Sequence, residues 1–352
     1  MAPARSPRRS FPVWKYSLFA AIAVLVSLAV VGGALLATDL FLHRKFEKAA
    51  GLNVWGYRGP VVGRKQAGER RVIVLGGSTA FGYGVRAGEA FPAVLERSLR
   101  ARGRERGGGA VSVVNLAYNN EGAHSFRFTL DDYQYLRADV VLIYTGYNDL
   151  GRPGANTYVF RHDSPIFRLT GYMPILPLVL REKAILLRHG NLEAAYRGEK
   201  TTFRPNLAQR LTASTYESAM SVTQSLERQL GRLSPETRTP RPGTATECTS
   251  RWRTYCDEVA AAVDLALARG QRVLVVAEPY ISDEHVQQQA ELAAMLAARF
   301  GAQPRVRRVD LGRAVDLHDP ALAYDGMHLT VQGNERIAAR LVGPVADLLE
   351  TL

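Results

Sequence analysis

From residue 71 to the C-terminus, short apolar runs alternate with segments whose apolar residues recur every three or four positions. The five apolar runs are "RVIVLGG", "AVSVVNLA", "ADVVLIYTG", "QRVLVVAEP" and "RVRRVDLG". Short, continuously apolar runs are typical of strands covered on both faces, and the periodic segments between them indicate helices. The alternation predicts an α/β fold, a three-layer doubly wound parallel sheet of five strands.

Residues 150–247 interrupt this alternation. The segment contains prolines at 153, 165, 174, 177 and 205, shows no clear strand pattern, and ends in the turn-rich "LSPETRTPRPGTATE". A helix is expected near 207–231. We interpret the segment as an insertion after the third strand, expected to act as a lid or a substrate-facing subdomain within the domain at 71–352.

The segment "YSLFAAIAVLVSLAVVGGALLA", residues 16–37, contains no charge. It exceeds the roughly 20 residues that span a bilayer and the roughly 7–15 apolar residues of a signal peptide. We therefore expect a transmembrane helix over 16–38, a basic tail over 1–15 and a connector over 39–70. A cleaved signal remains the alternative, because "ALLATD" offers small residues at a cleavage position.

Basic residues flank the apolar segment unevenly. Four precede it, namely Arg5, Arg8, Arg9 and Lys15, whereas those after it are partly offset by Asp39 and Glu47. This bias predicts a single-pass protein of the cell membrane with a cytoplasmic N-terminus. The rest of the chain would lie outside the cytoplasm, in the periplasm of a Gram-negative cell.

The net charge of +12 lies largely in peripheral tracts, without a basic stripe interleaved with aromatic residues. Nucleic acid is therefore not expected as a partner. The two cysteines, Cys248 and Cys256, would lie roughly 12 Å apart on one continuous helix, too far for a disulfide. A disulfide thus requires that "ECTSRWRTYC" be partly turn, and the sequence leaves this open.

Polar residues follow the strands at the edge where ligands bind in an open parallel sheet. Ser78 follows the first strand and Asn115 the second, with the turn that contains Gly122 after it. "GYND" follows the third strand, and "DLHDPALAYDGMH" follows the fifth. The carboxyl edge of the predicted sheet therefore collects hydroxyl, amide, carboxylate and imidazole groups.

These residue types fit acyl transfer. A serine nucleophile, Ser78, needs a base that is itself oriented by a carboxylate, and His328 lies three positions after Asp325. The oxyanion needs hydrogen-bond donors. The N–H groups of Ser78 and Gly122 and the side-chain amide of Asn148 are the candidates.

With these blocks in order, the sequence resembles the SGNH hydrolases, also called GDSL esterases and lipases. "LGGSTAFGYG", "NLAYNNEG", "TGYND" and "YDGMHLTVQGNERIA" resemble the four family blocks, and "NVWGYRGP" resembles a segment of membrane-anchored bacterial members. The resemblance covers about 71–149 and 272–350. It implies a flavodoxin-like sheet, the catalytic residues Ser78, Asp325 and His328, and an oxyanion hole of Ser78, Gly122 and Asn148. The family's first block usually reads G-D-S, whereas Gly77 stands here in place of the aspartate.

Four further residues near the strand ends are candidate substrate contacts: Tyr147, His124, Glu278 and Tyr280. Asp149 is expected to be structural. Asp316, His318 and Asp319 have no diagnostic metal spacing, so we expect no metal. The glycines at 76–84 match neither phosphate-binding pattern, which excludes a nucleotide site at this turn. No cofactor is expected.

The sequence therefore predicts a membrane-anchored serine ester hydrolase. Its substrate would be a carbohydrate or lipid O-acyl ester, with O-deacetylation as one case. An O-acyltransferase that modifies cell-envelope glycans is the alternative reaction, because the same triad serves both. A non-catalytic envelope binding protein on the same fold is the alternative from another class.

Overall fold

A computed structural model describes residues 12–47, 51–105, 109–151, 159–191, 203–231 and 248–350. Its centre is one parallel sheet in the order β2-β1-β3-β4-β5. The strands are β1 Arg70–Gly76, β2 Val111–Asn115, β3 Val140–Thr145, β4 Arg272–Ala277 and β5 Val306–Asp310. The predicted five-stranded parallel α/β sheet is confirmed. The strand order reverses between β1 and β3, which is where an open sheet forms its binding crevice.

The strands differ in burial. β2 and β3 are buried along their whole length, and β1 and β4 at every position except the first. β5 is only partly buried, and Arg307 is exposed. The expectation that every strand is continuously apolar and covered on both faces is therefore wrong for β5. The reason is its place at the sheet edge, where it pairs with β4 alone.

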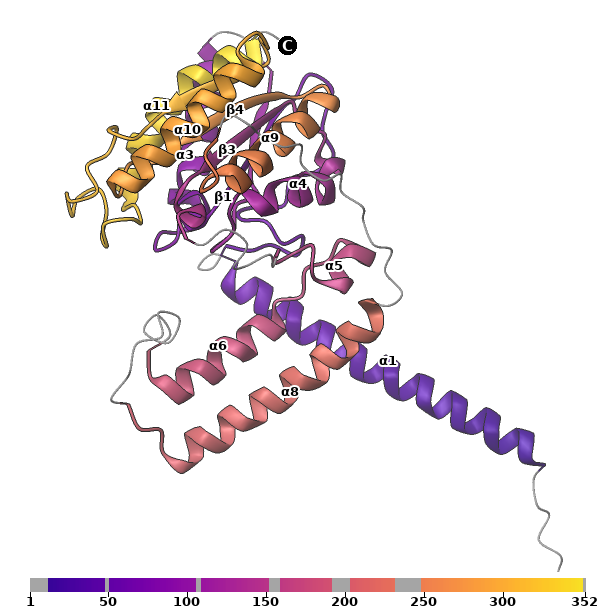
Figure 1. The fold of residues 1–352 in the computed structure, drawn as a ribbon. Helices are drawn as coiled ribbons and strands as arrows, with labels where there is room; N and C mark the ends of the chain where they lie inside the picture. The colour runs from indigo at the N-terminus through magenta and orange to yellow at the C-terminus, as the bar shows by residue number, and fades with distance from the viewer. Residues whose placement is uncertain are drawn as a thin grey trace, which may run out of the picture.

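Helices cover the sheet in two layers (Figure 1). α3 Phe91–Glu105 packs with α11 Val331–Glu350, while α9 Arg253–Ala268 packs with α4 Ala123–Asp132 and α10 Asp283–Phe300. Short helical turns complete the domain: α2 Ser78–Phe81, η1 Ala87–Glu89, η2 Gln134–Leu136 and η3 Tyr147–Asp149. α2 and η3 follow directly on β1 and β3, so both lie at the carboxyl edge of the sheet.

The N-terminal apolar segment forms one long exposed helix, α1 Val13–Phe46. Its apolar part is long enough to cross a membrane. Over the most apolar stretch the mean hydropathy is 2.6 and no residue is buried. The helix continues past the predicted boundary at residue 38, so the first residues of the predicted connector are helical. Asp39 accepts the N–H of Ile175 at 2.9 Å, and His43 Nε2 lies 2.9 Å from the carbonyl oxygen of Met173. The end of α1 is therefore attached to the insertion.

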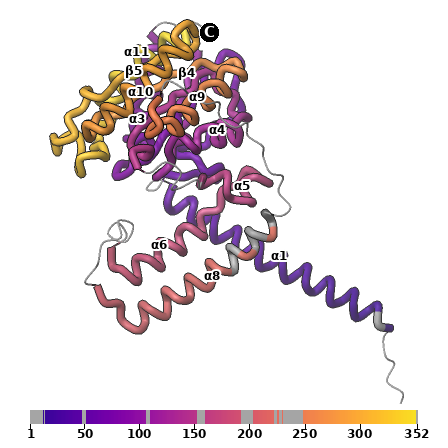
Figure 2. The backbone as a smooth tube through the Cα atoms, in the orientation of Figure 1, coloured from indigo at the N-terminus to yellow at the C-terminus, as the bar shows by residue number. Residues whose placement is uncertain are grey.

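The insertion contains α5 Pro165–Thr170, α6 Leu176–His189 and α8 Leu207–Gly231, and no strand within its described residues. The helix predicted over 207–231 is confirmed. The sequence pattern did not predict α5 and α6, because their prolines suggested broken helices. Pro165 and Pro177 instead occupy the first turn, where the backbone N–H has no acceptor within the helix. α6 packs against α8 and also contacts α1 (Figure 2). The turn-rich segment before Cys248 lies outside the described residues, and the role as a lid stays a prediction.

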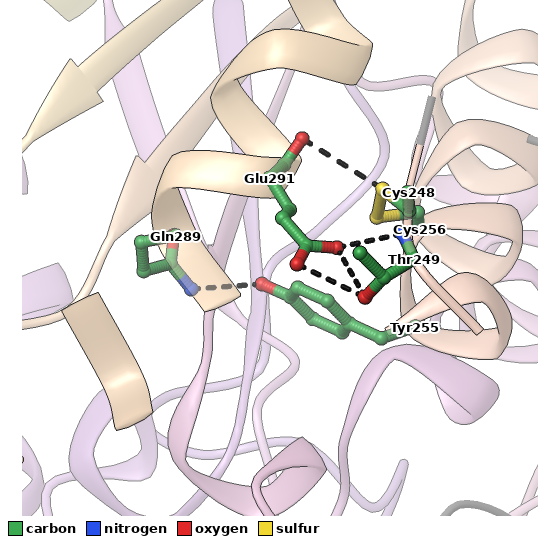
Figure 3. The surroundings of a disulfide bond; sticks show 6 residues. All are labelled: Cys248, Thr249, Tyr255, Cys256, Gln289 and Glu291. Carbon is green, nitrogen blue, oxygen red and sulfur yellow. Dashed lines mark hydrogen bonds between the residues drawn. A yellow bond between two sulfur atoms is a disulfide. The ribbon is translucent and has the colours of Figure 1, made fainter. Parts of the chain in front are cut away.

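Cys248 and Cys256 form a disulfide with their Cα atoms 6.6 Å apart. Cys248 precedes a turn, and Cys256 lies near the start of α9, so the segment between them is partly turn, as a bridge requires. The N–H of Thr249 donates to Glu291 Oε2 at 2.8 Å, which ties this turn to α10 (Figure 3).

Candidate active site

The chain turns sharply where β1 ends. Gly77 precedes the first residue of α2, which is Ser78. A Cβ on Gly76 would lie 2.7 Å from the Tyr144 carbonyl oxygen of neighbouring β3, so only glycine allows this close passage. The Tyr83 N–H returns to the Ser78 carbonyl at 2.9 Å, and Gly82 provides the left-handed residue, with φ of 82°, that the return needs. Ser78 is thereby presented at the edge of the sheet.

His328 connects Ser78 to Asp325. Its Nε2 lies 2.8 Å from Ser78 Oγ, and its Nδ1 lies 2.7 Å from Asp325 Oδ2. Three residues that the sequence placed on two distant loops therefore form one continuous hydrogen-bonded chain. The geometry allows the serine hydroxyl to donate to the imidazole and the imidazole to donate to the carboxylate.

The Asp325 carboxylate is held by its own loop. Its Oδ1 accepts the N–H of Met327 at 3.0 Å and of His328 at 2.7 Å. Partial burial works to raise the pKa of Asp325, but the hydrogen bonds from His328 and Met327 outweigh it and hold the pKa below its ordinary value. Asp325 is therefore an ionised acceptor that orients His328.

Two tyrosines flank His328, and the sequence analysis did not single them out. The Tyr83 ring lies 4.9 Å from the imidazole, and the Tyr324 ring stacks on it at 5.9 Å with an interplanar angle of 18°. Tyr324 directly precedes Asp325 in "YDGMH", and Tyr83 follows Ser78 by five positions. Their places beside the two motifs were the available signal.

The Asn148 amide lies between the two turns that carry the other oxyanion candidates. Its Nδ2 donates to the Glu121 carbonyl at 2.8 Å, and a Cβ built on Gly77 would lie only 2.0 Å from it. Ser78 is the first residue of α2, and Gly122 directly precedes α4. N–H groups at such positions have no acceptor within their own helix. The Asn148 amide thus lies next to Gly77, the residue before Ser78, and next to Glu121, the residue before Gly122.

This arrangement explains the departure from G-D-S at Gly77. Its backbone angles, φ −89° and ψ −153°, do not demand glycine. The limit is the space around it: a side chain at residue 77 would displace the Asn148 amide from the volume that this amide occupies. In this chain, glycine at 77 and the position of the Asn148 amide depend on each other.

Asp149 ties the loop after β3 to the start of α4. Both carboxylate oxygens lie 3.1 Å from the Ala123 nitrogen, and a Cβ on Gly122 would lie 2.7 Å from Oδ1. Burial raises the pKa of Asp149 to about 7. These contacts agree with the structural role that the sequence indicated, and they set the position of Gly122.

Glu278 does not line a substrate pocket, contrary to the sequence-based expectation. The side chain is buried, and its two oxygens accept the Thr79 hydroxyl at 2.5 Å and the Tyr147 N–H at 2.7 Å. Thr79 follows Ser78, and Tyr147 precedes Asn148. Glu278 therefore connects the nucleophile turn with the Asn148 loop. Sequence reasoning found the residue but not its role, because burial is set by the packing of β4 between β3 and β5.

The other three candidate substrate contacts have different surroundings. Tyr147 is buried, and its hydroxyl donates to the Pro279 carbonyl at 2.5 Å. It therefore connects the loop after β3 to the loop after β4. The Tyr280 hydroxyl donates to Asp310 Oδ2 at 2.9 Å, at the end of β5. His124 is half-buried in the first turn of α4, and its contact with a substrate stays a prediction.

The loop with Asp316, His318 and Asp319 uses its carboxylates on its own backbone. Asp316 accepts the N–H of His318, and Asp319 accepts the N–H of Ala321, both at 2.9 Å. Within the described ranges, no group of three histidine, cysteine, aspartate or glutamate side chains is arranged to hold a metal ion.

We expect Glu278 to make folding depend on pH. Burial raises its pKa from 4.5 to about 7, so the folded state keeps a proton that the unfolded state releases between these values. The free energy of unfolding is therefore unaffected by the ionisation of Glu278 below pH 4.5. It falls by roughly 3 kcal/mol as the pH rises towards about 7, because the carboxyl then ionises in the unfolded state but not while it is buried. In Glu278→Gln, thermal unfolding should show a melting temperature that rises relative to wild type between about pH 5 and 8. Exposed Glu335→Gln on α11 is the control, and a pH-independent difference for Glu278→Gln would contradict the expectation.

No family model and no curated protein matches the chain. Similar solved structures include a family 3 carbohydrate esterase from Clostridium thermocellum, 12% identical with a TM-score of 0.43, covering 80% of this chain and 98% of that one. The psychrotrophic esterase EstA from Pseudoalteromonas is 9% identical with a TM-score of 0.43, covering 80% and 99%. A putative lipolytic protein of the G-D-S-L family from Desulfitobacterium hafniense is 12% identical with a TM-score of 0.39, covering 77% and 98%. At these identities and scores, the similarity says nothing about the activity of this chain.

Proposed function

We propose that this chain is a serine ester hydrolase that cleaves an O-acyl ester of a carbohydrate or lipid. The observation that supports this is the hydrogen-bonded chain from Ser78 Oγ through His328 to Asp325, with distances of 2.8 and 2.7 Å. A hydroxyl becomes a nucleophile when an oriented imidazole can accept its proton. No metal or cofactor takes part in the proposed reaction.

The proposed reaction has two halves. In the first, His328 Nε2 accepts the Ser78 proton as Oγ attacks the ester carbonyl carbon, and the protonated imidazole then donates that proton to the departing alcohol. In the second, His328 deprotonates water, which attacks the acyl-enzyme. The protonated imidazole then returns its proton to Ser78 Oγ as the Oγ–acyl bond breaks and the carboxylic acid leaves. The N–H groups of Ser78 and Gly122 and the Asn148 amide would stabilise the oxyanion in both halves. Asp325 would stabilise the imidazolium without accepting its proton.

We also propose that α1 anchors the enzyme in the cell membrane with its N-terminus in the cytoplasm and the sheet domain outside. The long exposed apolar helix supports an anchor. The disulfide between Cys248 and Cys256 supports an oxidising compartment for the sheet domain.

A fluorophosphonate probe tests the proposed function. The wild-type chain should be labelled on Ser78, as located by mass spectrometry, because the activated hydroxyl displaces fluoride from phosphorus. Ser78→Ala should lose both the label and ester hydrolysis, the latter by at least about 10³-fold. Ser221→Ala on α8, an exposed serine, should keep both. Equal labelling of wild type and Ser78→Ala would refute the hydrolase.

A further inference from the structure

A groove of about 790 Å³ lies between α6 and the loop that follows the nucleophile turn. Its volume falls in the range of about 300–1,000 Å³ that small-molecule sites occupy. Apolar side chains contribute to both walls: Ile175, Leu178, Val179 and Leu186 on the α6 side, and Phe81, Tyr83 and Val85 on the opposite side.

The α6 wall is one face of the helix. Residues 175, 178, 179, 182 and 186 line the groove, and their spacing of three and four places them on a single stripe. Leu186 is 41% exposed, so part of this stripe faces solvent rather than the core. Apart from Glu182 the stripe is apolar, and an apolar surface along an open groove favours an apolar ligand, because binding removes that surface from water.

One wall of the groove lies next to His328. Tyr83 lines it, and its ring lies 4.9 Å from the His328 imidazole. Arg58 holds this wall in place, since its guanidinium donates to the carbonyls of Phe81 at 2.5 Å and Gly82 at 2.7 Å. The wall follows directly on α2, so a chain lying in the groove approaches Ser78.

The groove is also close to the membrane anchor. Phe46, the last residue of α1, lines it. Phe46 is nine positions after Ala37, the end of the uncharged run, a rise of about 14 Å along the helix. The headgroup layer adds roughly 5–7 Å to each side of the hydrocarbon core, so with α1 in the bilayer the groove lies near its surface. The start of α6 contacts the end of α1, since the N–H of Leu176 donates to Asp39 (Figure 1).

The charged residues around the groove balance one another, so they do not favour a ligand of either charge. Two basic residues, Arg86 and Lys183, are matched by two acidic ones, Glu89 and Glu182. The remaining cation, Arg58, is engaged with backbone carbonyls of the wall. Recognition in this groove thus depends on apolar contact.

We propose that the groove binds the hydrocarbon acyl chain of an ester that resides in the membrane, with the ester carbonyl at Ser78. This inference rests on the proposed function and narrows its substrate from a carbohydrate or lipid ester to a lipid ester. The insertion supplies the chain-binding wall, and the anchor keeps the groove at the surface from which such a substrate enters.

The test uses the full chain in lipid nanodiscs with para-nitrophenyl acetate and para-nitrophenyl octanoate. Wild type should prefer octanoate. Val179→Trp places a bulky ring in the groove and should lower the ratio of octanoate to acetate kcat/KM by about tenfold or more, because several methylene groups lose their buried contact. Leu207→Trp on α8 is the matched control, since Leu207 is 73% exposed and outside the groove, and it should keep the wild-type ratio.

A second readout separates this inference from the proposed function. A diazirine-bearing fatty acid should cross-link to residues 175–186 in both wild type and Ser78→Ala, and excess octanoate ester should compete with it. Hydrolysis without a chain-length preference and without these cross-links would overturn the lipid groove and leave the hydrolase intact. Competed cross-links without any hydrolysis would keep the groove and refute the hydrolase. An unchanged ratio in Val179→Trp would also overturn the groove.

Discussion

His328→Gln is expected to lower kcat for ester hydrolysis by about 10⁶-fold. Glutamine retains polar atoms of similar reach, but its amide cannot accept the Ser78 proton at neutral pH or return it to the leaving alcohol. The hydrogen bonds at 2.8 Å to Ser78 and 2.7 Å to Asp325 show that one imidazole serves both partners. Single-turnover hydrolysis of a para-nitrophenyl ester, normalised to folded protein, measures the loss.

The matched control is His318→Gln. His318 is exposed ten positions before His328, and its loop bonds are made by its backbone N–H. This variant should hydrolyse the ester at the wild-type rate. Retention of more than about one per cent of kcat in His328→Gln would show that another group accepts the Ser78 proton and would contradict the assigned base.

Gly77→Ala is expected to lower kcat/KM by about 10²- to 10³-fold. The added Cβ would lie 2.0 Å from Asn148 Nδ2, so the amide must leave the position from which it can reach the oxyanion. Because the backbone angles at Gly77 suit any residue, the substitution should not strain the nucleophile turn itself. Ester hydrolysis and fluorophosphonate labelling together separate loss of oxyanion stabilisation from loss of the nucleophile.

A double-mutant cycle identifies the cause. If Gly77→Ala acts by displacing the Asn148 amide, then Gly77→Ala combined with Asn148→Ala should be no worse than Asn148→Ala alone. Gly63→Ala, at a glycine with open space around its added Cβ, should have no effect on kcat/KM. Additive losses in the double variant would mean that Gly77 and Asn148 act independently, which would contradict the coupling.

The periodicity of the sequence was sufficient for the sheet and its helices. The five predicted strands appear at their expected positions, because a buried parallel strand must be apolar throughout and a covering helix must be apolar on one face. The apolar pattern was weakest at β5, where the consecutive Arg307 and Arg308 are accommodated because the strand lies at the edge of the sheet. The periodicity also failed to predict α5 and α6, because the sequence does not distinguish a proline that begins a helix from one that ends it.

The roles of individual polar residues were harder to predict. Glu278 and Tyr147 follow strands and therefore seemed available to a substrate, yet both are buried and support the catalytic loops. Tyr83 and Tyr324 were not predicted, because their places beside the motifs do not show that the fold brings their rings against His328.

The alternating α/β fold, the apolar N-terminal helix and the strand ends at which Ser78, Asn148, Asp325 and His328 occur could all be predicted from the amino-acid sequence. These features are local, because periodicity, length and residue type decide them. The tertiary packing sets which groups meet: His328 bridges Ser78 and Asp325, the Asn148 amide takes the side-chain space at Gly77, and α6 and the end of α1 line a groove whose opposite wall includes Tyr83, next to His328. Those contacts join residues up to 250 positions apart, and the distances between them depend on the packing of the whole sheet.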